Sequence, residues 1–445
     1  MNHPIINVLR AQKQGLNIGI YSCCSSNEYV LKAALLRGKK NNEYVLIEST
    51  ANQVDQYGGY TGMTPKDFYE FIQRLIKETG INPELVILGG DHLGPLTFSH
   101  YDEEKAMNEA EELIKQYVVA GFTKIHIDTS MKVASDSPDI RLPDMTIVKR
   151  GARLVKVAEA AYKNLCLENP EAIHPVYIVG SEVPIPGGAQ EITEMQITKP
   201  DDFLNTVALY EKVFKEENLN EAWKYVCGVV VQPGVEEKDA GCTEYDRSKA
   251  ERLMAEIKKY PNLMFEGHST DYQTKYKLQE MVEDGVGILK VGPALTFALR
   301  EAMFGLAFAE KEYYKRIPEK QSYFMETLER KMGENPKYWQ KHYHGQYWEI
   351  DLKKKYSFSD RCRYYMPDPD VQGALNKLLF NFQQGVPLNL LSQFLPKQYV
   401  KIREGKLDNN PEMILIDNVC EVINNYCFAT KQGELTNGSV TERSN

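Results

Sequence analysis

The segment VGILKVGPA, residues 286–294, joins a short apolar run to a Gly-Pro turn that opens a helix. It contains the last of eight β-rich runs in the first 300 residues, and helical patterns separate these runs. Most are continuous apolar stretches, as expected for parallel strands buried on both faces. The runs are Asn17–Ser22, Glu43–Glu48, Glu84–Gly89, Thr123–Asp128, Pro175–Gly180, Cys227–Gln232, Asn262–Gly267 and Val286–Val291. Eight parallel strands that alternate with helices predict an α/β fold, the (β/α)₈ TIM barrel.

Amphipathic stretches lie between the runs, for example Pro65–Glu78, Asp102–Ala120 and Arg247–Lys259. An open, doubly wound sheet is the alternative architecture. The absence of a GxGxxG motif after the first run argues against it, because that motif marks the dinucleotide-binding version of the open sheet.

The chain changes character after about residue 310. Residues 311–445 contain no further strand–helix pattern and are rich in aromatic residues and lysine. We therefore expect a barrel over residues 1–310 and a helical C-terminal extension over residues 311–445. Aromatic helices of this kind favour assembly, so we also expect a homo-oligomer.

Bulk composition excludes several classes of function. The 445 residues are 42% hydrophobic and 26% charged, as in an ordinary globular protein. A net charge of -9 argues against broad binding to nucleic acid or to an anionic membrane. No run reaches the roughly 18 apolar residues of a membrane span, and no signal peptide is visible. Eight cysteines without a CxxC pair fit reduced thiols, so we expect a cytoplasmic protein.

Polar residues gather where the expected strands end, which is where barrels of this fold place their active sites. Imidazole and carboxylate groups together suit a divalent metal. We assign His92, His268 and Glu182 as metal ligands. Asp91 cannot easily point at the same metal as its neighbour His92, so we expect it to act as a base. For any single histidine, a plain hydrogen-bonding role is the better interpretation, and we assign that role to His126 inside the fourth run.

Phosphate binding is expected in the loops after the seventh and eighth runs, the usual cradle in barrels. The candidates are Ser269, Thr270, Gly292 and Ala294, the last two at the start of a helix that favours an anion. A Gly-Pro turn can also simply begin a helix. Arg361 and Arg363 could clamp a second phosphate, or could lie in a solvated turn.

The loop after the second run is rich in glycine and amides. Its residues Asn52 and Gln53, with Glu48 before them, fit a polyhydroxyl ligand, because amides both donate to and accept from hydroxyls. A mobile lid or a plain turn is the alternative. Ser130 and Gln232, at the ends of the fourth and sixth runs, complete the candidate substrate-binding residues.

Six segments resemble a known family: IESTANQVDQYGGYTGMTP, LGGDHLGP, HIDTSM, GSEVPIPGG, EGHSTDYQT and LKVGPALTFALREA. They are similar to the D-tagatose-bisphosphate aldolase accessory subunits, the Z-type family, and the resemblance covers nearly the whole chain. It implies a barrel related to class II aldolases, in which an Asp-His pair resembling Asp91-His92 binds zinc and acts on a substrate hydroxyl. It also implies that His268 and Ser269 meet zinc and phosphate. The remaining zinc histidine has no match, since the sixth run ends in Gln232, so Glu182 or Gln232 would have to replace it.

Two functions follow from this resemblance. The first is a metal-dependent enzyme that acts at C4 of a phosphorylated ketohexose, such as a fructose 6-phosphate/tagatose 6-phosphate 4-epimerase working by retro-aldol and aldol steps. The metal would be Zn²⁺, or else Mn²⁺, Co²⁺ or Ni²⁺. Asp91, Asp128 and Asp271 would move protons to and from hydroxyls. The alternative is a non-catalytic subunit that stabilises a class II tagatose-1,6-bisphosphate aldolase partner, an interpretation that Gln232 favours.

Overall fold

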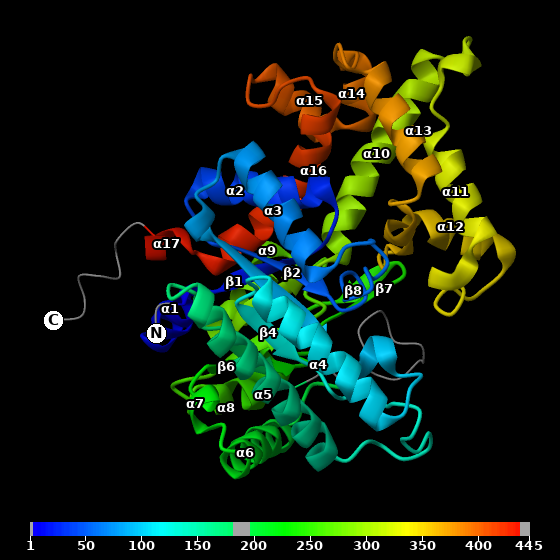
Figure 1. Cartoon of the computed structure of the whole chain (residues 1–445). Helices are drawn as coiled ribbons and strands as arrows, with labels where there is room; N and C mark the ends of the chain where they lie inside the picture. The colour runs from blue at the N-terminus through cyan, green and yellow to red at the C-terminus, as the bar shows by residue number, and fades with distance from the viewer. Residues whose placement is uncertain (1–2, 181–195, 437–445) are drawn as a thin grey trace.

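A computed structural model describes residues 3–180 and 196–436 of the chain (Figure 1). Eight parallel strands form a closed barrel in the order β1-β2-β3-β4-β5-β6-β9-β10, with β10 pairing back to β1. The fold is therefore the expected (β/α)₈ barrel. Its strands are β1 Ile20–Cys24, β2 Val45–Thr50, β3 Val86–Leu93, β4 Lys124–Ile127, β5 Val176–Val179, β6 Val226–Val231, β9 Met264–Gly267 and β10 Val286–Val291.

Helices surround the barrel on its outer face (Figure 1). They are α2 Glu28–Asn41, α3 Pro65–Thr79, α4 Glu103–Val119, α5 Asp144–Glu168, α6 Pro200–Glu216, α7 Asn220–Trp223, α8 Arg247–Ile257, α9 Lys275–Asp284 and α10 Pro293–Tyr313. Sequence-local signals fix their ends. In α3, for example, the Thr64 side chain accepts from the Asp67 amide while Asp67 bonds back to Thr64, a capping box that satisfies otherwise unpaired amides.

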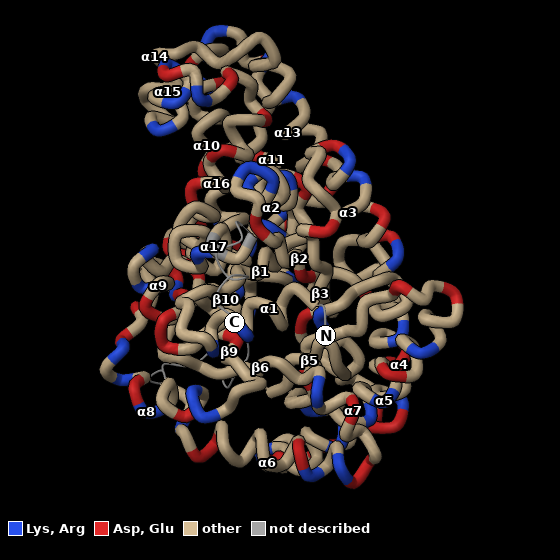
Figure 2. Tube along the Cα trace, turned by 90° about the vertical axis from the view of Figure 1, so that its left-hand side faces the viewer, with Lys and Arg blue, Asp and Glu red and all other residues tan. Residues whose placement is uncertain are grey.

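A short N-terminal helix, α1 (Pro4–Lys13), closes the bottom of the barrel. Its apolar residues pack with inward-facing side chains of the strands, such as Ile20, Ile178 and Met264. Figure 2 shows α1 across the opening of the strand ring. The N-terminal end of the barrel is thereby filled with apolar side chains, which leaves the C-terminal end for polar groups.

Two elements interrupt the simple strand–helix alternation after β6. A small antiparallel hairpin, β7 (Glu236–Lys238) and β8 (Gly241–Thr243), lies between β6 and α8. It follows the C-terminal end of a barrel strand, so it belongs to the loops that cover the rim.

The C-terminal part is helical, as expected. It comprises α11 Phe324–Glu334, α12 Tyr347–Tyr356, α13 Pro369–Asn381, α14 Leu388–Phe394, α15 Pro396–Arg403, α16 Pro411–Thr430 and α17 Gly433–Thr436. The expected boundary after residue 310 falls inside α10. Helix α16 returns to the barrel and packs on α2, α9, α10 and β1, so part of the extension completes the outer wall.

Charged residues of both signs are interspersed along the outer helices (Figure 2). Within the described ranges, no helix combines the length and apolarity needed to cross a bilayer.

Candidate active site

A cavity of about 200 Å³ lies at the C-terminal ends of the strands. Eleven of the residues expected to form the site line it: Asp91, His92, Asp128, His268, Asp271, Asn52, Gln53, Ser130, Ser269, Gly292 and Arg363. The strand ends therefore bring together residues that are up to 311 positions apart in the sequence, from Asn52 to Arg363.

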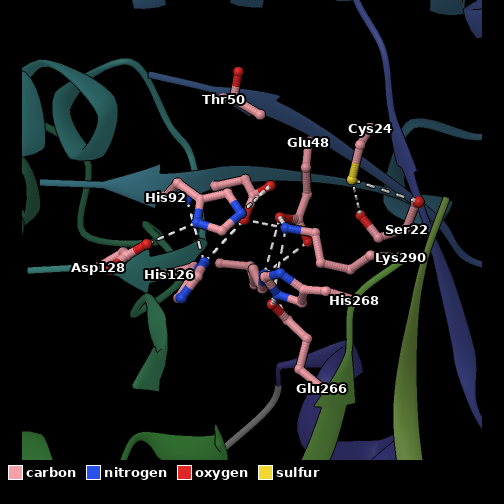
Figure 3. Close-up of polar contacts among 12 residues, drawn as sticks. Ser22, Cys24, Glu48, Thr50, His92, His126, Asp128, Glu266, His268 and Lys290 are labelled. Carbon is pink, nitrogen blue, oxygen red and sulfur yellow. Dashed lines mark hydrogen bonds and ion pairs between the residues drawn. The ribbon is translucent and has the colours of Figure 1, made fainter. Parts of the chain in front are cut away.

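Three imidazoles lie close together at this end of the barrel (Figure 3), and those of His92 and His268 line the cavity. The ring centroids of His92, His126 and His268 lie 4.9, 5.0 and 5.3 Å from one another. One donor atom from each ring and one carboxylate oxygen of Asp91 all fall within 4.8 Å. A cluster of three imidazoles and a carboxylate is a donor set that suits Zn²⁺ and similar divalent ions.

The backbone at His92 explains how neighbours share this cluster. His92 has a φ of 48°, in the left-handed region, and the register of β3 against β4 shifts between Gly90 and Leu93. This irregularity brings His92 Nε2 within 3.7 Å of Asp91 Oδ2. Asp91 and His92 thus belong to one cluster, contrary to the expectation that Asp91 cannot easily point at the same metal as His92. In a regular strand the two side chains would lie on opposite faces.

Carboxylates outside this cluster hold two of the three rings. Asp128 Oδ2 lies 2.8 Å from His92 Nδ1, and Glu266 Oε1 lies 2.9 Å from His268 Nε2. Metal-binding imidazoles are usually held this way, since the carboxylate fixes the ring and raises its basicity. Burial lowers the pKa of His92, but Asp91 and Asp128 outweigh it and the net shift is upward. Burial and the charge of Lys290 lower the pKa of His268 to about 3, so this ring is neutral.

His126 has a hydrogen-bonding role in this geometry. It is fully buried, with Nδ1 2.9 Å from Asp91 Oδ1 and Nε2 3.0 Å from the Gly180 carbonyl oxygen. Its membership of the cluster makes it a third candidate ligand, which the sequence had not indicated.

Buried ion pairs fill the barrel below the imidazoles. Lys124 Nζ lies 2.8 Å from Glu48 Oε1 and 2.7 Å from Glu266 Oε2, and all three side chains are fully buried. Lys290 Nζ lies 3.2 Å from Glu48 Oε2 and also contacts Asp91 Oδ1 (Figure 3). Glu48, expected to bind substrate, instead bridges the two lysines and does not line the cavity.

The amides at the start of α10 already have an anionic partner. Asp271 Oδ1 accepts from the amides of Gly292, at 3.0 Å, and Ala294, at 2.7 Å. These are the amides expected to cradle a phosphate. The preference of a helix N-terminus for negative charge is met here by a carboxylate of the chain itself.

Of four further expected residues, three do not line the cavity and one lies outside the residues that the structure describes. Thr270 is fully buried and donates to the Lys290 carbonyl oxygen. The Gln232 side-chain oxygen accepts from the amides of Gly234 and Val235, which explains why it does not face the imidazoles. Arg361 donates to the Tyr338 carbonyl oxygen behind the cavity wall. Glu182 lies outside the described residues.

Arg363 is the expected arginine that reaches the cavity. Its guanidinium donates to the carbonyl oxygens of Ser359 and Asp360 and to the Tyr364 hydroxyl. These contacts orient the group without a direct carboxylate bond. Arg363 also lines a second cavity of about 420 Å³, which shares Cys24, Gln53 and Tyr60 with the first. The Arg363 guanidinium therefore lies at the junction of the two cavities.

Several polar residues of the site were not singled out from the sequence: Lys124, Lys290, Glu266 and Glu237. The first three had a signal, because each is a charged residue inside an otherwise apolar strand and alternates with residues that face outward. Glu237 lies on β7, in a loop segment whose sequence gives no such indication.

A protein family and several solved structures are similar to this chain. The family model described as D-tagatose-1,6-bisphosphate aldolase subunit GatZ/KbaZ-like matches residues 5–431. Among solved structures, a protein described as a probable tagatose 6 phosphate kinase from Sinorhizobium meliloti 1021 is 40% identical, with a TM-score of 0.83. That match covers 93% of this chain and 100% of the other. The YdjI aldolase from Escherichia coli K12 is 11% identical with a TM-score of 0.42, over 84% of this chain and 95% of the other, a similarity too weak to carry a conclusion.

Proposed function

The chain belongs to the GatZ/KbaZ-like family of D-tagatose-1,6-bisphosphate aldolase subunits, and from this premise we propose that it is a metal-dependent enzyme acting at C4 of a phosphorylated ketohexose. The favoured reaction is the interconversion of fructose 6-phosphate and tagatose 6-phosphate. One observation carries the proposal: His92 and His268 converge on one cavity, each held by a carboxylate.

The chemistry of the substrate restricts the route. The hydrogen on C4 of a ketohexose is not acidified by the C2 carbonyl, so simple deprotonation is a poor way to invert C4. Cleavage of the C3–C4 bond, rotation of the aldehyde and re-formation of the bond invert C4 instead. This route needs stabilisation of negative charge on the C2 and C3 oxygens and a proton carrier for the C4 oxygen.

The residues of the rim fit these requirements. His92 and His268, with Asp91 and His126 beside them, would hold the divalent cation. When bound, such a cation would act as a Lewis acid and stabilise negative charge on the substrate oxygens. Asp128 and Glu266 fix the two rings, as carboxylates do in metal sites.

The phosphate would bind at Arg363. Its guanidinium has no ion pair with a carboxylate among the described residues, so an anionic ligand would neutralise it. Asn52, Gln53 and Ser130 line the same cavity as Arg363, His92 and His268 and would contact hydroxyls. The adjoining cavity leaves room at the phosphate end of the substrate.

The direct test uses the purified chain alone. The protein is loaded with Zn²⁺, Mn²⁺, Co²⁺ or Ni²⁺ and given fructose 6-phosphate, and tagatose 6-phosphate is measured. We expect product with at least one metal, and loss of activity with a chelator and in a His92→Ala variant. His100→Ala, an exposed histidine outside the cavity, is the matched control. No product with any of the four metals would refute the proposal.

A second candidate function is a subunit that stabilises a class II aldolase. Family membership favours it directly, and so does Gln232, whose side-chain oxygen is bound by two loop amides instead of facing the imidazoles. Co-purification with a class II aldolase chain, and loss of that chain's stability on separation, would support this role. Failure to bind any divalent metal would also favour it over the epimerase.

A further inference from the structure

The hairpin after β6 brings a carboxyl group into the cavity. Glu237 lies at the centre of β7, paired with Cys242 of β8, and is only 6% exposed. Its neighbour Lys238 is exposed, in keeping with the alternation of side chains along a strand. Glu237 lines the same cavity as Asp91, His92 and His268. The hairpin therefore delivers an acid to a site otherwise built from the ends of barrel strands.

One oxygen of this carboxyl group is unsatisfied. Glu237 Oε2 is buried and has no hydrogen-bond partner among the described residues. Buried polar atoms without partners are rare and costly in folded proteins, so such an atom in a cavity indicates a ligand or a proton. Because Glu237 and Arg363 line the same cavity, a hydroxyl of the bound sugar can supply the missing contact.

A second carboxyl group stands beside it. Asp271 also lines the cavity, and its Oδ1 is fixed by the amides of Gly292 and Ala294. Burial and the charge of Asp271 raise the pKa of Glu237 to about 7. Burial raises the pKa of Asp271 to about 6 against the effect of the two amides. Arg363 and Glu236 are the other charged groups that act on Glu237. Two interacting carboxyl groups of this kind titrate as a pair, so this pair takes up and releases protons between about pH 6 and pH 7.

The other acids of the cavity each use at least one oxygen for contacts within the protein. Asp128 uses Oδ2 for His92 and Oδ1 for the amide and hydroxyl of Ser130. Asp91 uses Oδ1 for His126 and Lys290. Glu237 differs from them in that one of its oxygens is buried and has no hydrogen-bond partner among the described residues.

We propose that Glu237, with Asp271 beside it, is the acid–base group that exchanges the proton of the substrate C4 hydroxyl. This role rests on the proposed C4 chemistry. Glu237 as carboxylate takes the proton from the C4 oxygen, the C4–O bond becomes the aldehyde carbonyl, and the electrons of the broken C3–C4 bond pass into the enediolate over C2 and C3. In the reverse step C3 attacks the other face of the aldehyde, and Glu237 returns the same proton to the new C4 oxygen. No oxidant or reductant is needed.

The test compares Glu237→Gln and Glu237→Asp with the wild type in the metal-loaded chain. General acid–base groups contribute about 10²–10⁴-fold to rate, so we expect Glu237→Gln to lower kcat by that factor with unchanged metal content and KM. Glu237→Asp, which keeps the carboxyl group, should retain an intermediate kcat with a shifted pH profile. Glu244→Gln, an exposed acid just after the same hairpin, is the matched control and should behave as wild type.

A second readout does not depend on turnover. Difference infrared spectra between pH 5 and pH 9 should show the carbonyl stretch of protonated carboxylic acids in the wild type and a weaker band in Glu237→Gln, in which Asp271 still contributes. Wild-type turnover with Glu237→Gln active within threefold, or a band of unchanged intensity in Glu237→Gln, would overturn the role of Glu237 alone. Failure of the wild type itself to turn over would overturn the proposed function and this role together.

Discussion

Removal of Lys124 probes the buried ion pairs that support the site. Its ammonium lies 2.8 Å from Glu48 and 2.7 Å from Glu266. At an effective dielectric constant of about 20, each contact is worth roughly 6 kcal/mol before the cost of desolvation. Replacement by methionine keeps the length of the side chain but leaves Glu48, Glu266 and Asp91 with one ammonium, that of Lys290. Loss of one partner of a buried pair costs about 3–5 kcal/mol, and we expect Lys124→Met to lower the free energy of unfolding by that amount at pH 7.5.

The pH dependence has a defined sign. Lys124 and Lys290 overcome burial and hold the pKa of Glu266 well below its usual 4.5. A carboxyl group with a lowered pKa stabilises the fold above its unfolded pKa and loses that effect as the pH falls through the folded value. Without Lys124 the pKa of Glu266 rises, and protonation relieves the buried charge. The loss of unfolding free energy in Lys124→Met should therefore be largest at pH 7–8 and should become smaller toward pH 5.

The assay is unfolding by urea at pH 7.5 and at pH 5, monitored by circular dichroism. Lys249→Met is the control, because Lys249 is 73% exposed and lies 3.7 Å from Asp246; an exposed pair is worth less than about 1 kcal/mol. The double variant Lys124→Met/Glu48→Gln should recover part of the loss, since it removes one of the unpaired carboxylates. Equal stability of Lys124→Met and wild type at both pH values, or no recovery in the double variant, would refute the reasoning.

Three further outcomes are expected. His268→Ala should lower bound metal well below wild type by elemental analysis, since it removes a proposed ligand, and unchanged metal content would argue against that assignment. Arg363→Met should raise KM for the sugar phosphate by about 10–100-fold, the loss of a charged hydrogen bond of about 1.5–3 kcal/mol, whereas an unchanged KM would exclude Arg363 from phosphate binding. Glu237→Gln should match the wild type in thermal unfolding near pH 4 and exceed it by up to about 3 kcal/mol at pH 8, because a carboxyl group with a pKa raised to about 7 opposes folding once ionised; a variant no more stable at pH 8 would contradict the burial of that charge.

The barrel itself could be predicted from the chain because each parallel strand is a continuous apolar run. The bounds of β10 agree with the predicted run, and the other strands begin or end within a few residues of theirs. Helix α1 and the β7–β8 hairpin escaped notice, because each is short and its role arises only from what it packs against.

The residues of the site also fall into two groups, those that the sequence pattern indicates and those that only the folded structure shows. Asp91, His92 and His268 were identifiable because they end strands, and ends of parallel strands meet. The charged interior residues Lys124 and Lys290 could have been recognised from their period-two spacing. The use of the α10 amides by Asp271 could not, because a sequence shows a helix start but not which anion reaches it. Glu237 required the fold of the hairpin as well.

Helix α16 determines when the outer wall of the barrel can be completed during synthesis of the chain. The Tyr426 hydroxyl donates to the Thr270 carbonyl oxygen at 2.9 Å, and the Thr430 carbonyl oxygen accepts from the amide of Gly19 just before β1. These contacts join the last turns of α16 to the loop after β9 and to the residue before β1. A nascent chain can pair β1 with β10 once residue 291 has left the ribosome, yet the wall over that seam waits for more than a hundred further residues. Completion of the outer wall by α16 is therefore a late and long-range event in biosynthesis, the kind of step that is slow and leaves apolar surface exposed until it occurs.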